Sequence, residues 1–242
     1  IFAVILAGGP SGAFLLLKVD QKWLQVLRGV LLLLEIGVFV LSFRYLALAD
    51  AHVLMATAPL MVTGLSVVFL SEVVGLRRWG AIAAGLLGVA IVLQPEGDLF
   101  RPAALIALSA AFLFALYQVV TRRVSRKDSA VSSLLYLALV GLLILTFLVP
   151  FFWVNPTLVD FLLMVGLGFL GALGHFTLIK ALEAAPASTL QPFFYAVLVW
   201  AVPLGYLLFG QVPSLPTFIG AAVIVACGLY TFHRESLRKP LN

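Results

Sequence analysis

Long apolar runs separated by short polar breaks make up almost the whole chain. Each run is close to the roughly 20 residues that cross a bilayer as a helix. A backbone surrounded by lipid must satisfy its own hydrogen bonds, so runs of this length are expected to be helical. The pattern predicts an all-α polytopic membrane protein with candidate helices at 1–17, 24–46, 51–71, 77–95, 102–121, 131–152, 158–183, 187–209 and 216–233.

Composition supports the same fold class. Of the 242 residues, 63% are hydrophobic and 10% are charged, whereas soluble domains carry about 25% charged residues. The net charge of +5 would suit a nucleic-acid partner, but the basic residues lie in short loops between spans, where membrane topology explains them. We therefore expect a lipid bilayer and no nucleic acid as partner. The single cysteine, Cys227, cannot supply a cysteine cluster, and we predict neither a metal nor a cofactor.

The distribution of Lys and Arg predicts the orientation. With the basic tail 234–242 in the cytoplasm, all but two of the 15 basic residues lie on that side, and the two on the other side are Arg44 and Arg101. This asymmetry is typical of cytoplasmic loops. We predict a multi-pass protein of the plasma (inner) membrane with a cytoplasmic C-terminus. The start at Ile1, inside an apolar run, suggests that one helix of a ten-helix protein is missing.

Two stretches of the chain resemble each other. Residues 44–51 read RYLALADA and residues 180–187 read KALEAAPA, and after an apolar span the copies continue with LSEV at 70–73 and FGQV at 209–212. The offset is 136 at the start (180 − 44) and 139 at the end (211 − 72), which predicts a three-residue insertion. An odd number of spans separates the copies, so they run in opposite directions. Inverted repeats are typical of secondary transporters.

The motifs of the first half resemble a known family. They are RGVLL at 28–32, FRYLALADA at 43–51, APL at 58–60, LSEVVGLRRW at 70–79 and GLLGV at 85–89. They resemble the EamA-like branch of the drug/metabolite transporter (DMT) superfamily, and the resemblance covers essentially the whole chain. It implies ten helices in two inverted five-helix repeats, here 1–95 without its first helix and 102–233. It also implies an inner-membrane carrier of small metabolites, often an exporter. At Gly210-Gln211 the chain has Gln where the family has Glu, at a position that is structural in the family.

Glu35 is the first candidate site residue. It lies at the midpoint of span 24–46, and Arg28 and Ser42 lie seven residues to either side, on the same helix face. A carboxylate at bilayer depth is costly and marks a functional site by default. We predict that Glu35 binds a cationic or amine-bearing solute or carries a coupling proton. The alternative is a structural Glu that ties helices together.

Further polar and aromatic residues lie in three other spans. Pro192 separates Gln191 from Tyr195, and Pro59 stands in the matching region of the first copy. Bent helices in corresponding positions of two repeats point to a binding site. The alternative for each residue is ordinary packing and interhelical hydrogen bonding. The predicted substrate-binding residues are Glu35, Tyr117, Gln118, His175, Gln191 and Tyr195.

Several functional classes remain open at this point. Without an HExxH motif, a CxxC pair or a phosphate loop, we expect no enzyme and no ATP hydrolysis. We expect secondary transport of a small-molecule solute by alternating access, with proton coupling and export as open alternatives. A Ser11–His175 dyad would make the chain an intramembrane serine protease, and a channel or a non-transporting structural subunit is a third class. Small-residue stripes, Gly8 with Gly12, Ala81 with Gly85 and Ala84 with Gly88, indicate helix packing or a homodimer face.

Overall fold

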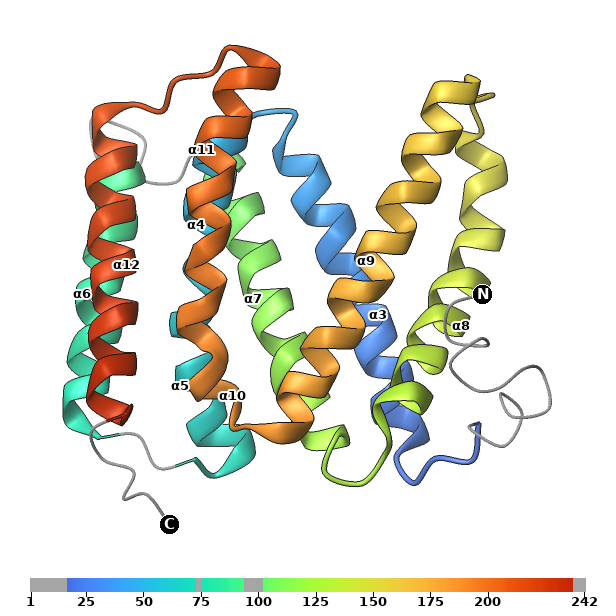
Figure 1. Ribbon diagram of the computed structural model, residues 1–242, viewed down its shortest axis with the longest axis horizontal. Coiled ribbons are helices and arrows are strands. Elements are labelled where there is room, and N and C mark those ends of the chain that lie inside the picture. Colours follow the sequence, from blue (N-terminus) through green and yellow to red (C-terminus); the bar gives the residue numbers. More distant parts are fainter. Residues whose placement is uncertain (1–16, 73–74, 94–101, 237–242) are drawn as a thin grey trace. The chain divides into compact units, whose positions relative to one another are not determined.

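The computed structural model describes residues 17–72, 75–93 and 102–236, and these residues form helices and connecting turns without a strand. The predicted helix 1–17, the stripe Gly8–Gly12 and Ser11 lie outside the described residues, apart from Leu17. The elements are α3 (Lys22–Ser42), α4 (Leu48–Met55), α5 (Ala58–Leu70), α6 (Leu76–Leu93), α7 (Pro102–Val124), α8 (Ala130–Leu148), η1 (Val149–Phe152), α9 (Leu158–Ala184), α10 (Ala187–Leu190), η2 (Gln191–Tyr195), α11 (Ala196–Phe209) and α12 (Leu215–Ser236) (Figure 1).

The membrane spans agree with the hydropathy pattern. Within the described residues, five helical segments are long and apolar enough to cross a membrane, namely Lys22–Ser42, Leu48–Leu70, Ala103–Val124, Ala130–Phe152 and Leu158–Ala184. The predicted spans 77–95, 187–209 and 216–233 correspond to α6, to α10 with η2 and α11, and to α12. Large apolar side chains such as Phe147 and Leu163 are exposed on α8 and α9. Apolar side chains on the surface suit helices that are surrounded by lipid. The predicted all-α membrane fold is confirmed.

Two predicted continuous spans are broken in the structure. The segment 51–71 divides at Ala56 and Thr57 into α4 and α5, and the segment 187–209 divides into α10, η2 and α11. In both, a proline occupies the first turn of the new element, Pro59 in α5 and Pro192 in η2. Proline lacks a backbone N–H, so it suits the first turn of a helix and is costly in its interior, although α11 accommodates Pro203 there. The two breaks therefore coincide with Pro59 and Pro192.

The chain divides into two compact units. The first unit comprises Ile1–Leu33 and Val120–Ala185, and the second comprises Leu34–Val119 and Pro186–Asn242. Each unit takes segments from both predicted sequence repeats, so compactness does not follow the repeat boundary. The division into repeats 1–95 and 102–233 and a tail 234–242 stays a prediction about sequence.

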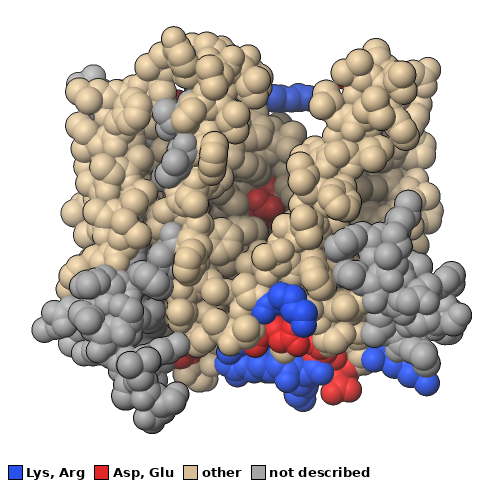
Figure 2. Space-filling model, viewed as in Figure 1, with Lys and Arg blue, Asp and Glu red and all other residues tan. Residues whose placement is uncertain are grey.

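The first unit is held at one end by a buried polar network. Asp128, between α7 and α8, accepts hydrogen bonds from the backbone N–H of Asp20 at 2.9 Å and from Gln25 Nε2 at 3.1 Å. Gln25 Nε2 also lies 3.0 Å from Ser133 Oγ, and Arg28 donates to the Ser133 carbonyl. Gln25 and Arg28 are fully buried, so these bonds satisfy groups that would be costly to bury alone. Charged side chains gather around this end of the unit (Figure 2).

The second unit contains the two copies of the repeat at a constant offset. α4 begins 139 residues before α10 (187 − 48), and α6 begins 139 residues before α12 (215 − 76). Two residues with left-handed backbone end α5 and α11 at the same offset (210 − 71): Ser71 has a φ of 56° and Gly210 a φ of 65°. The three-residue insertion predicted from the sequence is therefore wrong, because the motifs at 44–51 and 180–187 were aligned three residues out of register.

The two copies run in opposite directions inside the second unit. Glu72, at the end of the α4–α5 span where α6 begins, contacts Ser188. Asp50, at the opposite end of the same span, accepts a hydrogen bond from Thr217 near the start of α12. The equivalent helices α6 and α12 thus start at opposite ends of this unit and pack against each other as antiparallel neighbours (Figure 1). This is the arrangement that an inverted repeat requires.

Gly88 sets the distance between α6 and α12. A Cβ atom at this position would lie 2.9 Å from Ile224 Cγ1 and 3.0 Å from the carbonyl oxygen of Gly220. Both distances are shorter than normal contacts, and the second neighbour is backbone, which has little freedom to move. The predicted packing role of the stripe Ala84–Gly88 is thus confirmed at Gly88, and the partner helix belongs to the same chain.

Gly88→Ala should lower the free energy of unfolding by about 1–3 kcal/mol, because the added methyl overpacks the α6–α12 contact. Gly80→Ala is the matched control on α6, since nothing lies within 4 Å of its Cβ position. That control should be neutral or stabilising by up to about 1 kcal/mol through helix propensity. Thermal unfolding of both variants in detergent checks the prediction, and equal stabilities would contradict it.

Candidate functional site

Two glutamines, far apart in sequence, meet in the second unit. Gln118 lies on α7 and Gln191 begins η2, and both are buried. Gln191 Nε2 donates to Gln118 Oε1 at 3.1 Å and to the carbonyl oxygen of Ala187 at 2.6 Å. We call Gln118 and Gln191 the amide pair. Sequence analysis predicted both residues for the site, and the structure brings them into direct contact.

The amide pair keeps one donor and one acceptor unused. Gln118 Nε2 and Gln191 Oε1 are buried and form no hydrogen bond within the part of the chain that the structure describes. A buried polar atom without a partner costs about 1–3 kcal/mol, and native proteins contain few of them. An amide N–H next to an amide oxygen is the complement of another amide or of a lactam edge in a heterocycle.

Aromatic side chains lie beside the amide pair along α7 and η2. Tyr117, the neighbour of Gln118, is fully buried and stacks on Phe114 with ring centroids 6.1 Å apart. Phe114 in turn meets Phe194 of η2 edge to face, at 5.7 Å and 77°. Aromatic rings with a few convergent polar groups are typical of pockets for small organic ligands.

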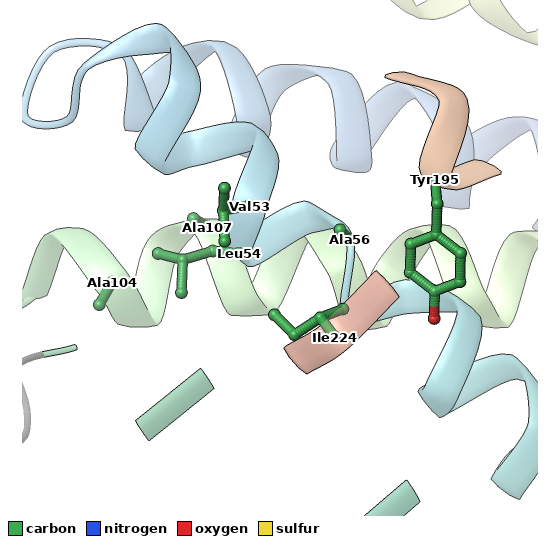
Figure 3. Close-up of a cluster of buried hydrophobic side chains, with 7 residues drawn as sticks. All are labelled: Val53, Leu54, Ala56, Ala104, Ala107, Tyr195 and Ile224. Atoms are coloured by element: carbon green, nitrogen blue, oxygen red, sulfur yellow. The ribbon is translucent and has the colours of Figure 1, made fainter. Parts of the chain in front are cut away.

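Tyr195 lies in a different environment from the one the sequence suggested. Its ring belongs to a buried apolar cluster with Val53, Leu54, Ala56, Ala104, Ala107 and Ile224 (Figure 3). The cluster joins α4, α7, η2 and α12. The Tyr195 hydroxyl is buried there and has no hydrogen-bond partner among the described residues. The Tyr195 ring is therefore part of the apolar core of the second unit.

Glu35 is buried, with 6% of its surface exposed. Among the residues that the structure describes, its carboxylate forms no hydrogen bond or ion pair. Arg28 and Ser42, predicted to share its helix face, are also fully buried, whereas Leu27 and Leu34 of the same helix are exposed. The polar stripe of α3 thus faces protein and its apolar side faces outward, as the spacing of the three residues predicted.

His175 belongs to a different compact unit from the other candidates. It lies on α9 in the first unit, half-buried and within electrostatic range of Arg28 of the same unit. The other five predicted site residues belong to the second unit. Its proposed dyad partner, Ser11, lies outside the described residues. Within the described ranges, no three His, Cys, Asp or Glu residues gather as a metal site would require.

Two contacts between the repeat copies were not predicted from the sequence. Glu72 Oε2 accepts a hydrogen bond from Ser188 Oγ at 2.7 Å, and Gln211 Oε1 accepts one from the backbone N–H of Leu48 at 2.9 Å. Glu72 and Gln211 are equivalent in the two copies (211 − 72 is 139). The Gln that replaces the family's Glu at 211 keeps the carbonyl oxygen that this bond needs. Matching polar residues at the ends of both copies were the signal that sequence analysis could have used.

Comparison with known proteins identifies the family. The model of the EamA-like transporter family matches residues 101–232. The riboflavin transporter of Vibrio cholerae is 34% identical over 86% of this chain and 71% of its own length. The S-adenosylmethionine uptake transporter of Rickettsia bellii is 29% identical over 90% of this chain and 75% of its own length. The pseudopaline exporter of Pseudomonas aeruginosa is 24% identical over 84% of this chain and 72% of its own length.

A solved structure has the same fold. It is described only as the crystal structure of a protein, and it matches 98% of this chain and 84% of its own with a TM-score of 0.68 at 21% identity. The relatives are named as small-metabolite transporters, so the intramembrane-protease alternative is not favoured. The chain is a multi-pass membrane protein that belongs to the EamA-like transporter family of the DMT superfamily.

Proposed function

We propose that this protein is a secondary transporter that carries a small metabolite across the plasma membrane by alternating access. The observation that carries the proposal is the amide pair. It is buried, it keeps an unused donor and acceptor, and it includes a residue of η2, where the second copy of the repeat is broken. Discontinuous helices at matching positions of inverted repeats are where secondary transporters bind their solutes.

The solute site consists of residues with distinct roles. The amide pair forms hydrogen bonds with a donor and an acceptor on one edge of the solute. The aromatic side chains of Phe114, Tyr117 and Phe194 pack against a planar ring. Glu35 supplies the negative charge for a cationic group or carries a coupling proton. Tyr195 belongs to the predicted set in the same unit, and His175 stays a separate prediction within the first unit. Riboflavin and S-adenosylmethionine, the solutes in the relatives' names, both contain a fused heteroaromatic ring, which is the class of solute that this set suits.

The proposal includes an orientation and a driving force. The C-terminus is cytoplasmic, since the opposite orientation would place most Lys and Arg residues outside. Transport is driven by a solute or proton gradient, and Glu35 is the proton carrier if a proton takes part. The relatives' names include both uptake and export, so they support a carrier without supporting one direction.

Flux measurements on the full-length protein test this function. The protein in proteoliposomes is given labelled riboflavin, S-adenosylmethionine and a panel of amino acids and nucleosides, with and without a pH gradient. We expect saturable flux of at least one heteroaromatic solute, above that of empty liposomes. Flux that responds to the gradient supports proton coupling, and its sign gives the direction. Folded protein without saturable flux of any solute would contradict the proposal.

A further inference from the structure

The Glu72–Ser188 contact lies at the start of α10, a segment with little stability of its own. α10 comprises only the four residues Ala187–Leu190, and its N-cap, Pro186, provides no side-chain hydrogen bond. One isolated helical turn is unstable in the absence of tertiary contacts. The side chain of Ser188 is nearly buried, and its hydroxyl donates to Glu72 Oε2 at 2.7 Å. This bond therefore anchors a segment that cannot hold its own conformation.

The backbone of α10 connects this anchor to the hydrogen bonds of the amide pair. The residue before Ser188 is Ala187, and its carbonyl oxygen accepts from Gln191 Nε2 at 2.6 Å. The same nitrogen donates to Gln118 Oε1 at 3.1 Å. A displacement of α10 would thus move the acceptor that orients the Gln191 side chain. It would also change which amide atoms of Gln118 and Gln191 remain unused.

We propose that Glu72 is a positioning residue of the solute site. Through Ser188 it holds α10 in place, and α10 in turn orients Gln191 on Gln118. Glu72 does not contact the solute in this scheme, and it acts through the conformation of residues 187–191. The inference rests on the proposed role of the amide pair in solute binding.

The equivalent contact in the other copy provides a natural comparison. Gln211 Oε1 accepts from the backbone N–H of Leu48, at the start of α4. The bond occupies the same position in the repeat, but α4 has eight residues and supplies buried residues to the apolar cluster around Ile224. Among the described residues, no hydrogen bond of the amide pair involves α4, although Val53 and Leu54 of α4 share the apolar cluster with Tyr195. Loss of the Gln211 bond should thus affect stability without displacing the amide pair.

Glu72→Ala should raise the half-saturation concentration for the transported solute about tenfold, the typical consequence of one lost hydrogen bond to a charged group. The maximal rate per folded molecule should change much less. Ser188→Ala should have the same effect, and the double variant should be no worse than either single variant, because both remove one interaction. Glu72→Gln should restore the half-saturation concentration, since its amide oxygen accepts a hydrogen bond as that of Gln211 does.

Gln211→Ala is the matched control, and it should leave the half-saturation concentration unchanged. Equal shifts in Glu72→Ala and Gln211→Ala would overturn the inference, as would an unchanged half-saturation concentration in Glu72→Ala. Hydrogen exchange at the amides of residues 187–195 provides a readout that needs no transport. Exchange there should accelerate in Glu72→Ala. It should stay unchanged in Glu72→Gln and in Gln211→Ala. Unchanged exchange in Glu72→Ala would overturn the inference, whether or not the unmodified protein transports a tested solute. A lack of transport by the unmodified protein would contradict only the proposed function.

Discussion

Glu35→Gln is expected to reduce transport by about 10- to 100-fold, the effect of losing one charge-assisted hydrogen bond in a buried site. The Glu35 carboxylate is buried near the middle of a membrane span and forms no bond with any residue that the structure describes. A buried charge without a protein partner is costly, so a bound solute or a proton is the natural means of neutralising it. Gln has the same shape and no charge, so folding and membrane insertion should be preserved.

Initial rates in proteoliposomes, normalised to folded protein from gel filtration, measure this effect. Glu183→Gln is the control, because Glu183 is an exposed carboxylate on α9 whose ion pair with Lys180 is worth little. The control should transport at the unmodified rate. Equal rates in Glu35→Gln and the unmodified protein would exclude Glu35 from the mechanism and support the structural role that its sequence position also allowed.

Gln191→Ala should raise the half-saturation concentration by about tenfold or more, because it removes a contact to the solute and leaves Gln118 without its partner. Gln118→Ala should have a similar effect. The double variant should lose less than the product of the two single effects, since the residues form one interacting unit. Solute affinity, measured by concentration-dependent flux for the three variants, tests all of these expectations together.

Gln25→Ala is the control for loss of a buried glutamine. Gln25 is fully buried and hydrogen-bonded to Asp128 and Ser133 in the first unit, so its removal should lower thermal stability. It should leave the half-saturation concentration close to that of the unmodified protein. Independent, multiplicative effects of Gln118→Ala and Gln191→Ala would show that the amide pair does not act as a unit in solute binding.

The sequence alone predicted the positions of the described membrane spans, but not the breaks within two of them, and it predicted the buried face of α3. The length and polarity of an apolar run decide whether it crosses a bilayer, and both are local properties of the chain. The spacing of Arg28, Glu35 and Ser42 likewise places them on one side of a helix, and all three are buried in the structure. The motifs around 43–51 and 70–79 indicated the EamA-like family, and the comparisons confirmed it.

The tertiary structure decided which polar residues meet. Gln118 and Gln191 are 73 positions apart and Glu72 and Ser188 are 116 apart, yet each pair is in contact. Tyr195, only one turn from Gln191, packs into an apolar cluster, and His175 belongs to the other compact unit. Hydropathy could not predict these outcomes, because lipid is as apolar as a neighbouring helix and gives no preference for one rotation of a helix that lacks a polar stripe. Close packing at residues such as Gly88 and a few buried hydrogen bonds select the arrangement, and both exist only in the folded chain.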